Sequence, residues 1–348
     1  MNIRVASKDD VQEWDSFVFS NNKGHICHLY YYYLTKFYNK NVQLINLLSR
    51  KGDKIFGIMP LILDGNRLIS FGGPLVAEGY EYLQYEFIKY VYKNFLTKLR
   101  VFIIKQSGLT IPNNDLEWLK KYGFNPEVNK TTILRLCGRS TEDIFKGLNK
   151  KNRNAIRKAI KHGVKIEKKC NSVEDFNYFG KIHKIANIQK GRKPYQSNYW
   201  NDVWYKIMAN YYGVADLYFA NVDGKRVAGV IVGRFGKKAF YAAGSFLREY
   251  GKFQPNNLIH WEVIQDLVND KFELYEFGDV GINSPDPQVK GIAKFKLSWG
   301  GEIYDKVSYY KHSSILSRIL DNMDGLKVAY RIIYRKIRNK ITGVIQNE

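Results

Sequence analysis

The stretch DLYFANVDGKRVAGVIVGRFGKKAFYAAGS, residues 216–245, decides the fold class of this 348-residue chain. It contains three apolar runs rich in valine, isoleucine and aromatic residues, separated by the short segments VDGKR and FGKK. Glycine beside aspartate or lysine between such runs is typical of tight hairpin turns. The stretch therefore predicts three consecutive antiparallel strands.

The same pattern occurs earlier in the chain. Residues 43–73, QLINLLSRKGDKIFGIMPLILDGNRLISFGG, also contain three apolar runs joined by the turn signals KGDK and DGNR. In each copy a segment of helical character follows, at 80–96 and 255–268, and then another apolar strand, at 100–106 and 272–279. This order predicts an α/β protein in which a mixed sheet with helices on its faces is built twice.

The repeat also predicts how the chain is divided. We expect a first domain at 1–138, a second domain at 139–312 and a ligand-binding cleft between them. A basic tail, 313–348, follows. Within it, 326–341 carries an apolar stripe and a cationic stripe at helical spacing. This pattern is typical of a helix on an anionic membrane surface and equally of a C-terminal helix packed on the body.

Charge is the most unusual feature of the composition. Lysine and arginine number 55 against 33 acidic residues, which gives a formal net charge of +22. Such a surface attracts nucleic acid, phosphorylated substrates or an anionic membrane face, and a merely solubilising surface is the alternative. An apolar content of 45% supports a packed core and argues against disorder.

The sequence offers no sign of export, membrane insertion or metal binding. The N-terminus lacks the apolar region of a signal peptide, and no apolar run is long enough to span a membrane. The three cysteines lack disulfide or zinc-site spacing. His25, Cys27 and His28 have no second cluster of ligands, so no metal is expected. We therefore predict a cytoplasmic protein with reduced cysteines.

Several motifs, in their order along the chain, resemble one known family. The repeated strand–helix order is similar to the GCN5-related N-acetyltransferase (GNAT) fold, and two such units resemble the FemA/FemB/FemX family of peptidoglycan bridge-forming aminoacyltransferases. The resemblance covers about 1–312 and implies two tandem GNAT-like domains. The motifs that carry it are HICHLYYYYLTKF (25–37), LNKKNRNAIRKAIKHGVKI (148–166), FYAAGSF (240–246) and GIAKFKLSWGG (291–301).

The chain also departs from the family. KQSG (105–108) stands where the first half of the family often carries Asp-Pro, which puts substrate contacts there in doubt. The second half has no segment for the long coiled-coil arm of some members. A compact architecture similar to FemX is therefore expected.

The resemblance implies an aminoacyltransferase that uses aminoacyl-tRNA as co-substrate and needs no bound cofactor. The acceptor would be an amine of a phosphorylated cell-wall precursor, UDP-linked or lipid-linked. One alternative is an acyl-CoA-dependent transferase acting on an envelope glycan. Against it, Phe253 in REYGKF (248–253) occupies a position that is small in CoA-binding GNAT enzymes, so we expect its ring to block the pyrophosphate. A non-enzymatic RNA-binding protein is the other alternative, although no RNP-type motif is present.

The family resemblance assigns the catalytic role to Lys296, whose ammonium group would stabilise the oxyanion formed during acyl transfer. We expect 291–301 to be an extended strand in which Phe295 anchors in the core while Lys294 and Lys296 point into the cleft. The following glycine pair would permit close backbone approach. Two surface lysines on an edge strand are the alternative.

Further substrate contacts are expected at four positions. Lys36 corresponds to a family lysine that holds substrate phosphate, and an exposed helix lysine is the alternative. Arg192 lies in the basic segment KGRKPYQSNYW (190–200), where its guanidinium suits phosphate oxygens, with a solvated loop as the alternative. Tyr241 and Ser245 belong to FYAAGSF, which resembles the Tyr-x-x-Gly-x-Ser strand of the family.

A strongly basic helix is expected within 146–169. Its Ile156, Ala159 and Ile160 are expected to face the core. Cations at steps of three and four share the opposite face: Lys150, Arg153, Arg157 and Lys161. Such a face suits a tRNA backbone, with salt-sensitive binding, and a solvated face is the alternative.

Overall fold

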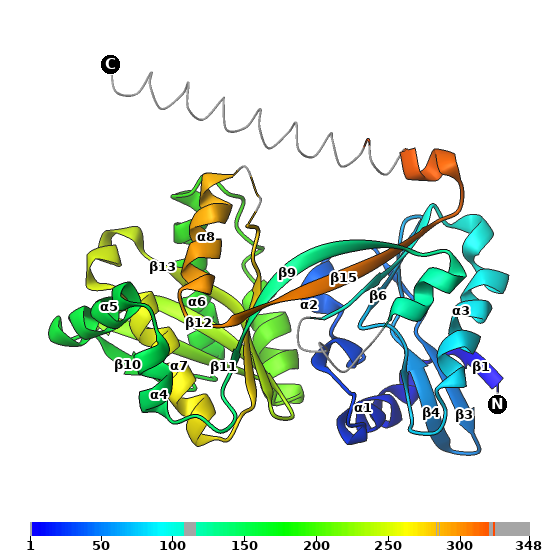
Figure 1. Cartoon of the computed structure of the whole chain (residues 1–348), viewed down its shortest axis with the longest axis horizontal. Coiled ribbons are helices and arrows are strands. Elements are labelled where there is room, and N and C mark those ends of the chain that lie inside the picture. The colour runs from blue at the N-terminus through cyan, green and yellow to red at the C-terminus, as the bar shows by residue number, and fades with distance from the viewer. Residues whose placement is uncertain (1, 108–115, 283, 285, 320–322, 324–348) are drawn as a thin grey trace.

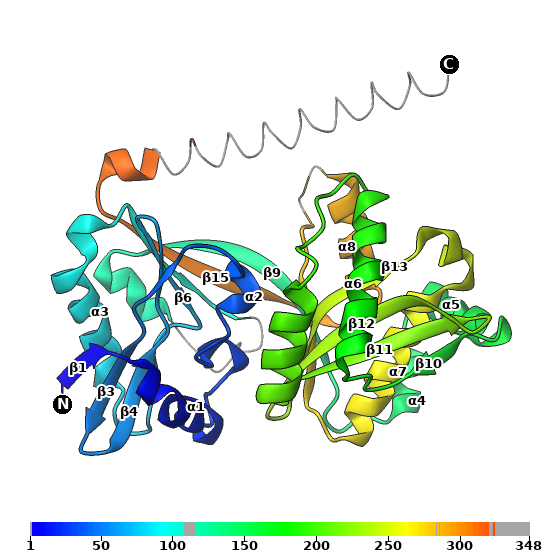
Figure 2. The same cartoon turned by 180° about the vertical axis from the view of Figure 1, so that it is seen from behind.

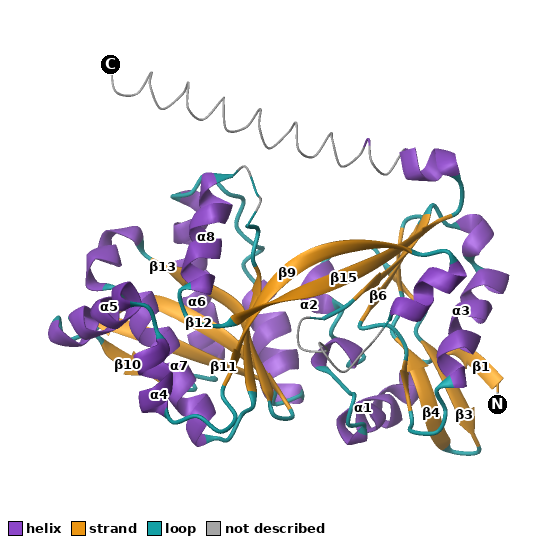
Figure 3. Ribbon diagram, viewed as in Figure 1, coloured by secondary structure: helices purple, strands orange, loops and turns teal. Residues whose placement is uncertain are grey.

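In the part of the chain that the structure describes, the strands form two sheets, one of four strands and one of eleven (Figures 1 and 3). The larger sheet contains both parallel and antiparallel pairs, and helices cover its faces. This confirms the α/β class with mixed sheets. The computed structural model describes residues 2–107, 116–282, 284, 286–319 and 323.

The second copy of the repeat has the predicted structure. The strands β11 (Ala215–Val222), β12 (Lys225–Phe235) and β13 (Lys238–Phe246) form an antiparallel meander. The first turn places both Asp223 and Gly224 at positive φ, 50° and 76°, which is the backbone of a type I′ hairpin. Glycine is needed at the second position because its conformation disfavours a side chain.

The first copy of the repeat differs from the prediction of one continuous meander. Its strands β3 (Leu47–Lys51) and β4 (Lys54–Met59) belong to the four-stranded sheet, whereas β5 (Ile62–Asp64) and β6 (Arg67–Phe71) belong to the larger one. Pro60 follows β4 directly. Proline has no N–H group for the strand ladder, so the middle strand ends there and the chain continues into another sheet.

The two halves of the chain exchange their last strands. β9 (Asn125–Arg135) pairs with β14 (Leu274–Asp279) of the second half, and β15 (Glu302–His312) pairs with β8 (Val101–Lys105) of the first half. β9 and β15 also pair with each other along their length. They form the long ribbon that joins the two parts of the molecule in Figure 1. The domain limits proposed from the sequence therefore remain a prediction, because the sheet runs through both halves.

The remaining elements are short strands and helices around this sheet. The other strands are β1 (Asn2–Val5), β2 (Gln43–Leu44), β7 (Leu75–Val76) and β10 (Lys165–Glu167). The helices are α1 (Val11–Ser20), α2 (Leu34–Phe37), α3 (Tyr82–Asn94), α4 (Thr141–Gly147), α5 (Lys150–Lys161), α6 (Val173–Ile188), α7 (Pro255–Asn269) and α8 (Pro287–Leu297).

Helices cover both faces of the second-half sheet. α5 and α7 lie on one face and α6 lies on the other, as the two opposite views show (Figures 1 and 2). A π-helix, Trp200–Tyr211, packs against α6 and reaches α2 of the first half. Its Trp204 and Met208 belong to a core that also contains Trp14 of α1. This shared core joins the two halves of the chain through aromatic side chains.

Residues 287–297 form the helix α8 instead of the expected strand. Asp286 is its N-cap and accepts a hydrogen bond from the amide of Gln288 at 2.9 Å, and Pro287 occupies the first turn. Both are strong helix-start signals. The helix ends before Gly300, which has φ 75°. A Cβ on Gly301 would lie 2.7 Å from Thr132 Oγ1, so the predicted close backbone approach is confirmed.

The C-terminal part of the chain is described only as far as the first turns after β15. The expected amphipathic helix at 326–341 lies outside the described residues. Where the structure is described, none of its helices is both long and apolar enough to cross a membrane.

Candidate active site

A cavity of about 760 Å³ lies where the two halves meet. Phe71 and Lys105 line it from the first half, and Tyr241, Glu276 and Lys306 line it from the second. This is the cleft that the duplicated pattern predicted. Because β9 and β15 are exchanged between the halves, the walls of the cavity are joined by strand pairing as well as by side-chain packing.

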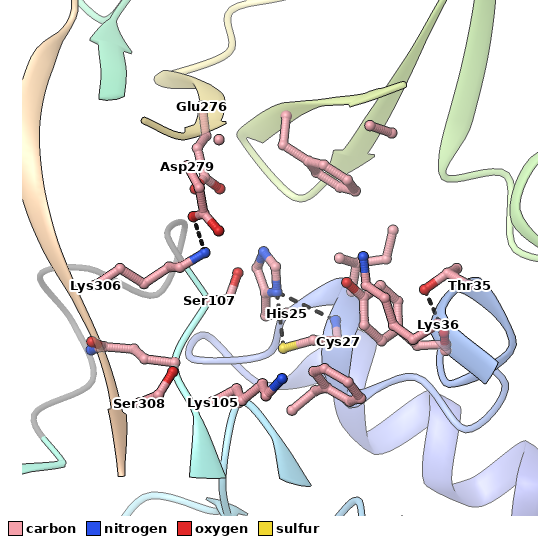
Figure 4. Close-up of a pocket in the computed structure, with 18 of the residues that line it drawn as sticks. His25, Cys27, Thr35, Lys36, Lys105, Ser107, Glu276, Asp279, Lys306 and Ser308 are labelled. Carbon is pink, nitrogen blue, oxygen red and sulfur yellow. Dashed lines mark hydrogen bonds and ion pairs between the residues drawn. The ribbon is translucent and has the colours of Figure 1, made fainter. Parts of the chain in front are cut away.

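Lysines converge on this cavity from different elements: Lys36 of α2, Lys105 of β8, Lys296 of α8 and Lys306 of β15. Figure 4 shows three of them around the open space. Burial in the cavity wall lowers the pKa of Lys36, Lys105 and Lys296. For Lys105 the nearby cations Arg67, Lys36 and Lys306 lower the pKa further. Cations gathered in this way are suited to an anionic ligand or a developing oxyanion.

Lys296 lies at the end of α8, beside the end of β14. Its Nζ donates a hydrogen bond to the backbone oxygen of Asp279 at 2.9 Å. Burial is the largest influence on its pKa, and the carboxylates of Asp279 and Glu276 partly oppose it. The family lysine therefore lines the cavity as predicted, but it does so from a helix.

Two carboxylates stand on β14 next to this lysine. Asp279 forms an ion pair with Lys306, drawn in Figure 4. Glu276 is only 6% exposed, and its Oε1 accepts a hydrogen bond from Thr131 Oγ1 at 2.6 Å. Sequence reasoning missed both residues. The available signal was an acid inside the apolar run FELYEFGD, where a buried strand has no structural need for a charge.

A second cavity, of about 640 Å³, lies in the second half. Arg192 and Ser245 line it together with two further cations, Lys190 and Arg248. Arg192 donates a hydrogen bond to Gln288 Oε1 at 2.7 Å, which orients its guanidinium at the wall. Ser245 is buried on β13. Two expected substrate contacts, Arg192 and Ser245, are thus brought together in a cavity different from that of Lys36.

The two cavities meet at Tyr241. This residue lines both of them. It lies on β13 just after Phe240, where the parallel pairing of β13 with β14 ends. On α8, Phe295 lines the second cavity and the next residue, Lys296, lines the first. The predicted catalytic lysine therefore stands at the junction of two separate binding spaces.

Phe295 also packs as an anchor, as predicted. Its ring lies 5.3 Å from that of His260 and 6.0 Å from that of the fully buried Trp299. Lys294 is exposed on α8 and lines neither of the two cavities. The expectation that Lys294 points into the cleft was wrong, because consecutive helix residues point about 100° apart rather than alternating.

The π-helix holds Lys36 in place from across the interface between the halves. The Tyr199 hydroxyl donates to the backbone oxygen of Thr35 at 2.9 Å, and it accepts from Trp204 Nε1 at 3.1 Å. A second contact joins Tyr38 to Asp202 at 2.6 Å. Residues of the second half therefore hold the backbone at Thr35 and the side chain of Tyr38, one on each side of Lys36. π-Helical segments are rare, and the short ones that interrupt α-helices are frequently found at functional sites.

The basic helix α5 forms as expected, but its faces differ in detail. Asn152, Ile156 and Ala159 are buried, whereas Ile160 is 58% exposed, so its predicted core position was wrong. Arg153 donates to the backbone oxygens of Lys146, at 2.9 Å, and Leu148. It therefore completes the end of α4.

Arg157 lies over the ring of Phe145, at 5.4 Å, while Lys150 and Lys161 are exposed. A tRNA contact by the four predicted cations stays a prediction, and only Lys150 and Lys161 have no such structural contact among the described residues.

Phe253 does not occupy the second cavity. Its ring packs edge-on against His162 at 5.6 Å and against Tyr250, and it is absent from the residues that line the space. Phe253 therefore does not close this cavity, and the expectation that its ring blocks a pyrophosphate stays a prediction. The preceding 3₁₀ turn, Arg248–Phe253, directs the ring toward α5.

His25, Cys27 and His28 form a buried cluster at the edge of the first cavity. His25 Nδ1 lies 3.1 Å from Cys27 Sγ. Burial lowers the pKa of both histidines, that of His28 to about 4, and raises the pKa of the Cys27 thiol. Within the described ranges, no three histidine, cysteine or acidic side chains come together as metal ligands would.

Comparison with known proteins agrees with this geometry. Residues 150–296 match the family model described as acetyltransferase (GNAT) domain. A lipid II:glycine glycyltransferase of Staphylococcus haemolyticus is 20% identical over 64% of this chain and 68% of its own length. Among solved structures, FemX matches with a TM-score of 0.73 at 16% identity, covering 93% of this chain and 99% of FemX. A tandem GNAT protein from the clavulanic acid biosynthesis pathway matches with a TM-score of 0.55 at 14% identity, covering 90% of this chain and 98% of that one.

The domain match and the relatives named glycyltransferases support an acyltransferase, and the fold is that of tandem GNAT proteins. Its similarity to the staphylococcal glycyltransferase and to FemX confirms the resemblance to the FemA/FemB/FemX family that was seen in its motifs. An enzyme is therefore established, and the alternative of a non-enzymatic RNA-binding protein is not supported.

Proposed function

We propose that this enzyme transfers an amino acid from aminoacyl-tRNA to an amine of a peptidoglycan precursor peptide. The observation that carries the proposal is the pair of cavities meeting at Tyr241 with Lys296 at their junction. An acyl transfer between two large substrates needs two binding spaces and one point at which the carbonyl and the amine meet. The name of the staphylococcal relative makes glycine and a lipid II-type acceptor the first pair to test.

In this proposal the acceptor occupies the first cavity. Lys36 and Lys105 face its phosphate groups, since they are the cations nearest to the first-half wall and neither has a carboxylate partner among the described hydrogen bonds and ion pairs. The acceptor peptide then extends toward Tyr241. A phosphate bound here would relieve the mutual repulsion that lowers the pKa of Lys105.

The acyl donor occupies the second cavity. Lys190, Arg192 and Arg248 supply the positive charge for its phosphates, and Ser245 and Phe295 supply polar and apolar wall. The ester carbonyl then reaches the junction, where Lys296 stabilises the oxyanion as nitrogen attacks. Lys150 and Lys161 of α5 are proposed to contact the tRNA backbone farther out. Contact of the C-terminal segment with an anionic membrane surface is a further part of the proposal.

Acyl-CoA is the second candidate donor, and the position of Phe253 favours keeping it. Because that ring packs against α5, the second cavity is open beside Arg248 and the N-terminus of α7. Helix N-termini and arginines bind pyrophosphate well. The position of Phe253 therefore weakens the sequence argument against CoA.

The deciding experiment offers both donors to the purified full-length protein. Radiolabelled glycine or mixed amino acids on charged tRNA are compared with radiolabelled acetyl-CoA, each with a lipid II-type or UDP-linked precursor. The proposal expects label in the precursor from charged tRNA only, and loss of that label when the tRNA is first treated with ribonuclease. Transfer from acetyl-CoA alone would replace the proposal by its alternative.

A further inference from the structure

The wall of the first cavity contains a buried carboxyl group for which the chemistry described above has no use. Glu276 lies on β14, three residues before the Asp279 carbonyl that holds Lys296. It lines the cavity although it is only 6% exposed. Figure 4 shows Glu276 and Asp279 reaching into the space from the same strand end. A buried acid is costly and is rarely kept without a partner or a task.

The proposed reaction requires a group that accepts a proton. A lysine-type amine has a pKa of about 10.4 and is an ammonium ion at neutral pH. It has no lone pair for attack until one proton leaves. After attack, the nitrogen carries a positive charge and must lose a second proton before the amide forms. A carboxylate at the junction of the cavities would serve both steps.

We propose that Glu276 is the general base of this enzyme, a role that rests on the proposed aminoacyl transfer. Its carboxylate takes a proton from the acceptor ammonium and passes it to solvent. The free amine attacks the ester carbonyl, so the C–N bond forms and the carbonyl electron pair becomes an oxyanion beside Lys296. The carboxylate then takes the second nitrogen proton. The C–O ester bond breaks, and the leaving alkoxide receives that proton from Glu276.

The other titratable groups at the cavity are less suited to this role. Asp279 is paired with Lys306 and its side chain is 62% exposed. Burial raises the pKa of Tyr241 to about 12, so it stays protonated. The buried Cys27 has a raised pKa and is occupied with His25. Glu127 lines the same space but lies on an exposed part of β9.

The surroundings of Glu276 act on its pKa in both directions. Burial raises its pKa, which makes the carboxylate a stronger base than an exposed glutamate. The Thr131 hydroxyl and the cations Lys306 and Lys296 oppose that rise, while Asp279 adds to it. Three more groups face it from the first half: Lys36, Tyr32 and Cys27. The cations favour the ionised form of Glu276, which is the form that accepts a proton.

The test uses Glu276→Gln in the full-length enzyme. Glutamine keeps the size and the oxygen that accepts from Thr131, but it cannot take a proton. With a precursor that carries a lysine-type amine, we expect kcat to fall about 10²–10⁴-fold and the acid limb of the pH–rate profile to disappear. With hydroxylamine, which is uncharged at neutral pH, the loss is expected to be much smaller after the uncatalysed rate is subtracted. Glu273→Gln, an exposed acid just before β14, is the matched control and should leave both rates unchanged.

A second variant tests the same idea without removing the carboxyl group. Thr131→Val deletes the hydroxyl that stabilises the ionised form of Glu276. We expect the pKa of Glu276 to rise, so the acid limb of kcat should move to higher pH with KM little changed. A purely structural Glu276 would not move this limb. Circular dichroism of each variant checks that it is folded.

The outcomes separate this inference from the proposed function. If the wild-type enzyme transfers nothing from charged tRNA, the proposed function itself fails. If the wild type is active but Glu276→Gln loses the same factor on both acceptors, or keeps the wild-type pH profile, Glu276 is not the base. An unmoved acid limb in Thr131→Val would contradict the inference even if Glu276→Gln does not fold.

Discussion

The hydrogen bonds of the Tyr212 hydroxyl provide a direct test of how the two halves of the chain are held together. This tyrosine follows the π-helix of the second half, and its hydroxyl donates to Asp15 Oδ2 of α1 at 3.0 Å. The same hydroxyl accepts from the amide of Tyr31 at 3.1 Å. Asp15 also accepts from the amide of Tyr30 at 2.9 Å. Burial raises the pKa of Asp15 to about 6, and the two donated hydrogen bonds oppose that rise.

Tyr212→Phe removes both hydrogen bonds of the hydroxyl and keeps the ring. A hydrogen bond to a charged group contributes about 1.5–3 kcal/mol and a neutral one about 0.5–1.5 kcal/mol. Above pH 7 Asp15 is ionised, so we expect the free energy of unfolding to fall by about 2–4.5 kcal/mol. At pH 5 most Asp15 is protonated and the loss should be about 1–3 kcal/mol.

The sign of this pH dependence follows from linkage. Because the folded protein raises the pKa of Asp15, the proton on Asp15 stabilises the fold at low pH, and this contribution is lost as pH rises through about 6. Without the Tyr212 hydroxyl, the pKa of Asp15 rises further and the loss at high pH grows. Urea unfolding at pH 5 and pH 8 measures the difference. Tyr211→Phe is the control, since Tyr211 is exposed and its hydroxyl forms no hydrogen bond among the described residues. An equal loss at both pH values, or a loss no larger than that of the control, would refute the reasoning.

Two further predictions concern substrate binding. Lys36→Met should raise KM for the phosphorylated precursor about tenfold or more with kcat little changed. The reason is that one charge-assisted contact is lost in the ground state and the transition state alike. Steady-state kinetics in which kcat falls instead would contradict this role. Binding of tRNA should weaken steeply between low and moderate salt, and Lys150→Met with Lys161→Met should reduce the salt slope by about two; a filter-binding slope unchanged by the double substitution would exclude α5 as the contact.

Sequence pattern predicted the second half of the molecule well for a physical reason. The strands β11, β12 and β13 are bounded by turns whose residues demand the conformation they adopt, as Asp223 and Gly224 show. Such information is local. For the first half, the prediction of one continuous meander was wrong at Pro60. Its missing N–H group ends a strand that the apolar pattern alone would continue.

The segment around Lys296 shows how the right site residue can be identified although its secondary structure is predicted wrongly. The alternation in Lys294, Phe295 and Lys296 suits a strand, and short segments of this kind do not separate helix from strand. Asp286 and Pro287 carried the deciding signal, because together they cap and start a helix. Lys296 was still assigned correctly to the cavity, because the Phe-Lys motif identified it and the predicted secondary structure did not enter that assignment.

The shape of the candidate site could not be predicted from local pattern. The exchange of β9 and β15 depends on pairing between residues more than a hundred positions apart. Glu276 becomes part of the cavity only where the pairing of β13 with β14 ends. The separation of the two cavities by Tyr241 likewise depends on how α8 packs beside that strand end. These features follow from tertiary packing.

The measurement that tests the account most directly is the kinetics of Lys296→Met beside Lys294→Met. The two lysines lie two residues apart on α8, but only Lys296 lines the cavity. If Lys296 stabilises the oxyanion, its substitution should lower kcat about 10²–10³-fold with KM for donor and acceptor nearly unchanged, because the ground-state ester carries no full charge. Lys294→Met should retain near-normal turnover. A Lys296→Met enzyme with near-normal kcat, or one that loses only affinity, would contradict the central claim.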